Sequence, residues 1–160
     1  MADPVTGVRL MAGTTVVGEY VEVVAYGRPA PQGSKRHVGH GVMVESSKAL
    51  KPWREAVKQA ALDVMDGTAP LDGPLLVRMV FTMPKPKSAP KRKVTFPDRT
   101  PDLSKLARAT EDALTDAGVW ADDARVVEYE RLAKVFPGED REGLHIPGVR
   151  IVVRQRVEAS

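Results

Sequence analysis

Acidic, hydroxyl and basic side chains follow one another at short intervals between Pro101 and Glu128. Asp102 is followed by Ser104, by Arg108 and then by either Glu111 or Asp112. From Ser104 onward the spacings are three to four residues, which places these side chains on one polar face of a helix. Asp122 and Asp123 form a second acidic group, just before a strand-like run. Carboxylates, a hydroxyl and a guanidinium can act in catalysis or in ligand binding, so this stretch contains the candidate functional residues of the sequence.

Local spacing alone does not bring the two acidic groups together. If the helix packs antiparallel to the strand that follows it, Asp122 and Asp123 lie at the far end of the helix from Asp102. A structural role also fits each residue. Asp102 suits a helix N-terminus, Asp122 and Asp123 suit a turn, and Arg108 with Asp112 suits a surface ion pair worth a few tenths of a kcal/mol.

The same stretch resembles the RusA-like family of Holliday junction resolvases, which phages and prophages typically encode. The hallmark of that family is P-D-x-D-N/K-L-x-K-x-x-x-D-A-L followed by G-x-W/Y-x-D-D-x-Q-V-V. This chain has PDLSKLAR at 101–108, DAL at 112–114 and GVWADDARVV at 118–127. Weaker similarity extends to GRPAPQGSKR at 27–36, KPWR at 51–54 and the basic stretch at 84–93.

The resemblance implies an endodeoxyribonuclease that depends on Mg²⁺, with Mn²⁺ as a substitute, and that needs no organic cofactor. It implies a homodimer that resolves four-way DNA junctions with paired symmetric nicks during recombination or repair. By position, Asp102 and Asp123 match the family's catalytic carboxylates and metal ligands. Asp122 is the neighbouring acid and a further candidate ligand, although a turn role suits it better.

Two positions depart from the family pattern. Ser104 stands where the family has a second aspartate, and Arg108 stands where it has a lysine. Serine removes a negative charge from the metal site, but Mg²⁺ needs only one or two protein carboxylates. Arg108 keeps the positive charge in a planar fork that can still hold a phosphate. The resemblance therefore implies that Arg108 stabilises the reacting phosphate and that Ser104 positions a water or the metal.

Basic residues are concentrated in two segments. Seven basic residues and two acidic ones lie between Arg28 and Lys58, and six basic residues and one acidic one lie between Lys85 and Arg99. The net charge of the whole chain is only +3, so acidic residues dominate elsewhere. This segregation indicates a side that faces phosphates. The expected DNA contacts are Lys35, Arg36, Lys85, Lys87, Lys91, Arg92, Lys93 and Lys105.

Hydrophobic periodicity predicts six elements. Strands are expected at 20–26, 75–83, 124–136 and 149–157, and the strand at 75–83 suits the interior of a sheet. One helix starts at Ser46 or Ser47, with Pro52 in its first turn, and ends at Asp66-Gly67. The second helix is expected to have Thr100 as its cap, Pro101 at its first position and Asp102 in its first turn, with Gly118 just past its end.

These elements predict an α+β, two-layer domain in which a mixed sheet of about four strands is packed by two main helices. Residues 1–18 read as a flexible lead-in, and 19–160 as one domain. Trp53 and Trp120 could stack on bases, but their positions favour core packing. His37 and His40 have no third ligand nearby, so we do not predict a metal site there.

The amino-acid composition excludes several classes of functional site. The chain has no cysteine, which excludes Cys-ligated zinc, iron–sulfur clusters and a cysteine nucleophile. No run of 18 apolar residues occurs, and we expect a cytoplasmic protein of a bacterial host cell. Two alternatives to a junction-cutting enzyme stay open. One is a branched-DNA-binding protein inactivated by Ser104, and the other is a small α+β protein whose basic loops contact an acidic protein.

Overall fold

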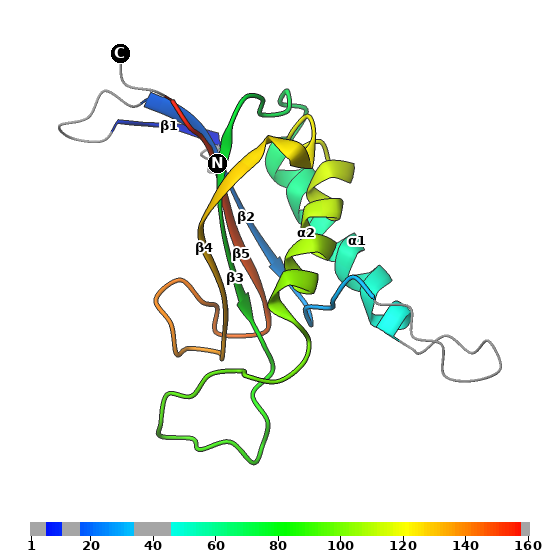
Figure 1. The fold of residues 1–160 in the computed structure, drawn as a ribbon, viewed down its shortest axis with the longest axis vertical. Coiled ribbons are helices and arrows are strands. Elements are labelled where there is room, and N and C mark those ends of the chain that lie inside the picture. The colour runs from blue at the N-terminus through cyan, green and yellow to red at the C-terminus, as the bar shows by residue number, and fades with distance from the viewer. Residues whose placement is uncertain (1–5, 11–16, 34–45, 158–160) are drawn as a thin grey trace.

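Two helices cover one face of a five-stranded mixed sheet in the computed structural model (Figure 1), which describes residues 6–10, 17–33 and 46–157. The strand order is β1-β2-β5-β3-β4, and β3 and β4 are the one parallel pair among these strands. The strands are β1 (Thr6–Leu10), β2 (Val17–Tyr26), β3 (Leu75–Thr82), β4 (Val126–Val135) and β5 (Gly148–Gln155). The predicted α+β two-layer arrangement is confirmed.

The edge strand β1 is a fifth strand that the sequence did not predict. It pairs antiparallel with the first half of β2, from Thr6 opposite Val21 to Leu10 opposite Val17. Its five residues, TGVRL, alternate only over Val8, Arg9 and Leu10, which is too short a pattern to predict a strand. The pairing depends on the backbone of β2, so side-chain patterning alone gives little sign of it.

The core lies between the sheet and the two helices, α1 (Ser46–Met65) and α2 (Leu103–Asp116). Inward residues alternate along β2 and β5, as a sheet with one covered face requires. Strand β3 is bonded on both sides and buried at every position except Arg78, so its predicted interior place is confirmed. Trp53 and Trp120 are 2% and 1% exposed, which confirms their prediction as core residues.

Helix α1 differs from the prediction at its start. The helix begins at Ser46, as expected, but Pro52 lies inside it rather than in its first turn. Proline fits the helical φ angle, but it lacks the N–H that would reach the carbonyl four residues earlier, and its ring crowds that carbonyl. That carbonyl belongs to the first turn, where water can replace the missing donor.

An ion-pair network ties the loop at 136–147 to the sheet face opposite the helices. Arg131 on β4 pairs with Asp140 at 2.7 Å and with Glu142 at 2.9 Å. Glu142 also pairs with Arg78 on β3 at 2.7 Å. Hydrogen bonding to the Arg131 guanidinium lowers the pKa of Asp140 to about 2.

We predict that Asp140→Asn lowers the free energy of unfolding at pH 7 by about 1–2 kcal/mol. The depressed pKa means that the contribution is complete above the ordinary aspartate pKa of 3.8 and is lost as the pH falls towards about 2. Urea unfolding at several pH values measures it, with the exposed Glu55→Gln as control. A deficit that stays constant between pH 4 and pH 2 contradicts this prediction.

Candidate functional site

The N-terminus of α2 is held by a lysine from the end of β4. Lys134 Nζ donates to the carbonyl oxygens of Arg99 at 2.8 Å and Pro101 at 2.9 Å. The helix begins at Leu103, and Asp102 is its N-cap, with an extended backbone and no side-chain capping hydrogen bond. The predicted cap at Thr100 is therefore wrong, because the lysine fixes the preceding chain outside the helix.

The C-terminus of α2 ends in a two-bond cap around a left-handed glycine. Gly118 has a φ of +76°, and its N–H donates to the Thr115 carbonyl, while the Val119 N–H donates to the Leu114 carbonyl. This is the Schellman arrangement, which favours glycine at the position after the cap. The predicted role of Gly118 is confirmed, and the cap directs the chain towards Asp122.

Asp122 and Asp123 lie side by side where the chain enters β4. Asp122 caps a single 3-10 turn (Asp123–Arg125) by accepting from the Ala124 N–H at 2.9 Å. This hydrogen bond lowers the pKa of Asp122. Hydrogen bonding to Asp122 raises the pKa of Asp123, and the Asp112 charge adds to the rise. Two carboxyl groups placed this closely favour a shared proton or a shared cation.

Two further residues of this region, Glu111 and Tyr129, had no predicted role in the site. The Tyr129 hydroxyl on β4 donates to the Glu111 carboxylate on α2. Burial raises the pKa of Glu111, and Asp112 and Asp123 contribute to the rise. Burial and the Glu111 contact also raise the pKa of Tyr129. We call Glu111, Asp112, Asp122 and Asp123 the acidic cluster.

Asp102 does not belong to the acidic cluster of its own chain. Asp112 lies ten positions after Asp102, which corresponds to about 15 Å along the helix. Ser104 and Arg108 are exposed on the helix between them. Within the described residues, no three His, Asp or Glu side chains lie close enough to hold a metal ion. The expectation that the two acidic groups lie at opposite ends of the helix agrees with this arrangement.

The loop between β3 and α2, residues 83–102, is held in place by contacts with the rest of the protein. We call it the basic loop. Glu139 pairs with Lys85 near the start of this basic loop and accepts from the Thr95 N–H at 2.9 Å. Lys85 also lies 5.6 Å from the centre of the Phe136 ring. Lys85 is therefore engaged within the protein, although the sequence assigned it to DNA.

The other predicted DNA contacts differ in their surroundings. Lys105 pairs with Asp102 at 3.5 Å. The predicted residues Lys35 and Arg36 lie outside the described residues, as do His37 and His40. Four predicted contacts of the basic loop are exposed, namely Lys87, Lys91, Arg92 and Lys93.

A model of the endodeoxyribonuclease RusA family matches residues 26–153, which include both helices, the acidic cluster and the basic loop. The chain belongs to the RusA endodeoxyribonuclease family. Membership implies Holliday junction endodeoxyribonuclease activity in general, and branched DNA as the substrate. A comparison with curated proteins found no match. No helix among the described residues of this RusA-family chain is long and apolar enough to cross a membrane.

A plot of log K for junction binding against log salt concentration has a negative slope. We predict that Lys91→Gln and Arg92→Gln each reduce the magnitude of this slope by about 1, because each removes one phosphate contact. Lys85→Gln should leave this slope unchanged, since Lys85 is bound to Glu139. Fluorescence anisotropy between 50 and 300 mM salt measures the three slopes. An equal decrease for Lys85→Gln would show that the lysine leaves Glu139 for the DNA.

Proposed function

We propose that this RusA-family chain resolves four-way DNA junctions as a homodimer, by Mg²⁺-dependent phosphodiester hydrolysis with paired symmetric nicks. The observation that carries this proposal is the acidic cluster, in which hydrogen bonding to Asp122 and the nearby Asp112 raise the pKa of Asp123. Carboxylate oxygens are the ligands that Mg²⁺ prefers, and one or two of them suffice when substrate phosphate and water complete the shell. The donor set therefore fits the ion.

The separation of Asp102 from the acidic cluster supports the proposed homodimer. About 15 Å of helix lies between Asp102 and the acidic cluster, whereas carboxylate oxygens bind Mg²⁺ at about 2.0–2.1 Å. One chain therefore cannot supply both matching family carboxylates to one ion. In a dimer with two-fold symmetry, the same surface of each chain contacts the other chain. Asp102 of one copy can then bind the same ion as Asp123 of the other copy. The same symmetry provides two sites for two cuts.

The chain's own residues have distinct roles in this site. Asp123 and Asp102 of the second copy would hold the ion, and a bound Mg²⁺ would supply an activated water and polarisation of the scissile phosphate. Asp122 keeps its 3-10 cap and thereby fixes Asp123. Arg108, exposed on α2, stabilises charge on the phosphoryl oxygens. Ser104, also exposed, orients water beside Asp102.

The basic loop and the Lys35–Arg36 segment supply affinity through phosphate contacts, which fix position without reading sequence. The expected chain of phage or prophage type would act in the cytoplasm of a bacterial cell, where its DNA substrate lies. A second candidate function is junction binding without cleavage. It is favoured by Ser104, because a neutral hydroxyl stands where the family places a carboxylate.

We predict metal-dependent paired nicks in an end-labelled four-way junction. Cutting should need Mg²⁺ or Mn²⁺ and stop with chelator. Asp123→Asn should reduce it at least about 100-fold, because the ion loses a charged ligand, and should preserve junction binding. Ser104→Asp should lower the Mg²⁺ concentration needed for cutting. A native protein that binds but never cuts, and that gains cutting in Ser104→Asp, would instead establish the binding-only function.

We further predict that two inactive variants restore activity when mixed. Asp102→Asn and Asp123→Asn chains, combined by unfolding and refolding together, form dimers with one intact shared site and one doubly altered site. Such dimers should nick one strand of each junction without the paired second cut. Each variant alone is the control. If the mixture stays inactive although mixed dimers form, each site lies within one chain and the shared arrangement is wrong.

A further inference from the structure

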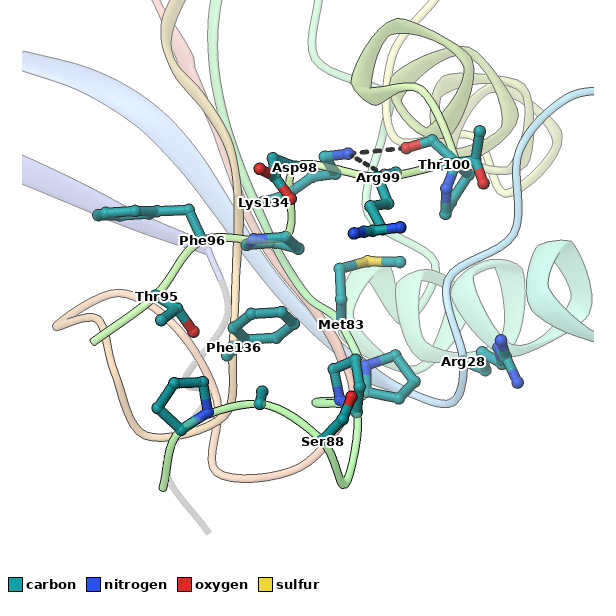
Figure 2. Close-up of a pocket in the computed structure, with 16 residues that line it drawn as sticks. Arg28, Met83, Ser88, Thr95, Phe96, Asp98, Arg99, Thr100, Lys134 and Phe136 are labelled. Atoms are coloured by element: carbon teal, nitrogen blue, oxygen red, sulfur yellow. Dashed lines mark hydrogen bonds between the residues drawn. The ribbon is translucent and has the colours of Figure 1, made fainter. Parts of the chain in front are cut away.

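A cavity of about 580 Å³ lies between the basic loop and the end of β4, next to the N-terminus of α2 (Figure 2). Three segments that are far apart in the sequence line it: Arg28 after β2, parts of the loop at 83–101 that include 95–101, and Lys134 with Phe136. Its volume falls within the range of about 300–1,000 Å³ that is usual for small-molecule pockets. Neither the proposed metal ligands nor the acidic cluster belongs to its lining.

The cavity combines an apolar wall with two arginines, Arg28 and Arg99, and one carboxylate, Asp98. Phe136 and Met83 are each 6% exposed and form the buried part of the wall. Phe96 also lines the cavity and is 70% exposed, which is unusual for a phenylalanine. Figure 2 shows the Arg99 guanidinium close to the Met83 side chain, within the cavity. Among the described residues, neither Arg28 nor Arg99 has a carboxylate partner.

One polar atom of the lining also lacks a partner. The Thr95 hydroxyl oxygen is buried and makes no hydrogen bond within the part of the chain that the structure describes. Buried polar atoms are rarely left in this state, and each one indicates an unseen partner such as a water or a ligand. In Figure 2 this hydroxyl points towards the Phe136 ring, along the apolar wall.

Contacts on both sides of the cavity hold its shape. Glu139 fixes the basic loop through Lys85 and the Thr95 N–H. Lys134 fixes the other side through the carbonyls of Arg99 and Pro101. Pro101 lines the cavity and directly precedes Asp102, so a ligand held here lies beside the proposed metal-binding end of α2.

A ligand that suits this lining has a flat, largely apolar body, a hydrogen-bonding edge and an anionic tail. A nucleotide has all three. Its base can pack on the phenylalanine wall and meet the Thr95 hydroxyl, and its phosphate can pair with Arg28 or Arg99. Stacking of a base on an aromatic side chain contributes about 1–3 kcal/mol and tolerates any sequence.

We infer that this cavity binds one unpaired nucleotide of the junction, displaced from the base stack at the branch point. The inference rests on the proposed function and extends it to substrate selection. Taking a base out of continuous duplex costs a few kcal/mol, and the cost is smallest where pairing is already interrupted. The cavity therefore favours branched DNA over linear duplex, and it does so beside Asp102.

The test uses a four-way junction with 2-aminopurine next to the branch point, because this base fluoresces more strongly when it is unstacked. Saturating protein should raise the fluorescence of the junction but not that of a matched duplex. Phe96→Ala and Arg99→Gln should each abolish most of the rise and lower the ratio of junction to duplex affinity about fivefold or more. Val94→Ala, 57% exposed in the same loop but outside the cavity lining, is the matched control and should behave as the native protein does.

The outcomes separate this inference from the proposed function. Junction binding and cutting without a fluorescence rise, or with a rise that Phe96→Ala leaves intact, overturn the cavity assignment and leave the nuclease proposal standing. If the protein does not bind junctions at all, the nuclease proposal fails. The cavity is then tested on a single-stranded oligonucleotide with 2-aminopurine, for which binding unaffected by Phe96→Ala overturns the inference.

Discussion

The fixed length of α2 is the constraint on which the rest of this account depends. A helix rises about 1.5 Å per residue and cannot be shortened without breaking its hydrogen bonds. Both of its ends are fastened, one by Lys134 and the other by the Gly118 cap. Between them a stripe from Leu106 to Leu114 is buried against the sheet. Asp102 and the acidic cluster are therefore held apart by a rigid spacer.

Because of this spacer, each metal site of the proposed homodimer would need residues from both chains. Each chain offers Asp102 at one end and the acidic cluster at the other, so a pair of chains can complete two equivalent sites. The basic loop and its cavity lie at the Asp102 end, because Lys134 fastens the loop and the helix start together. Substrate selection and the second half of the metal site would thus be coupled through one lysine.

Much of the fold could be predicted because the predicted elements carry strong side-chain patterns. Strand β3 is almost continuously apolar, and α2 repeats its apolar residues at helical spacing. The same patterns place Asp102 and Asp123 at opposite ends of α2. Strand β1 lacked such a pattern, since its pairing with β2 comes from the backbone.

Other features depend on contacts between residues far apart in the chain. Lys85 looks like any other lysine of the basic loop until Glu139, 54 residues later, is brought beside it. Tyr129 reads as an ordinary strand residue until β4 aligns with α2 and its hydroxyl meets Glu111. The helix start at Leu103 likewise depends on Lys134, 33 residues after the Pro101 carbonyl that it holds. Tertiary pairing decides all three features.

The most direct test of the shared site is Mn²⁺ binding measured against protein concentration, with the oligomeric state determined in the same samples. Electron paramagnetic resonance counts free Mn²⁺, and sedimentation velocity gives the fraction of dimer. We predict that bound Mn²⁺ rises with the dimer fraction, towards one ion per chain, and that Asp102→Asn abolishes this binding without dissociating the dimer. Full binding by monomers, or binding unaffected by Asp102→Asn, would contradict it.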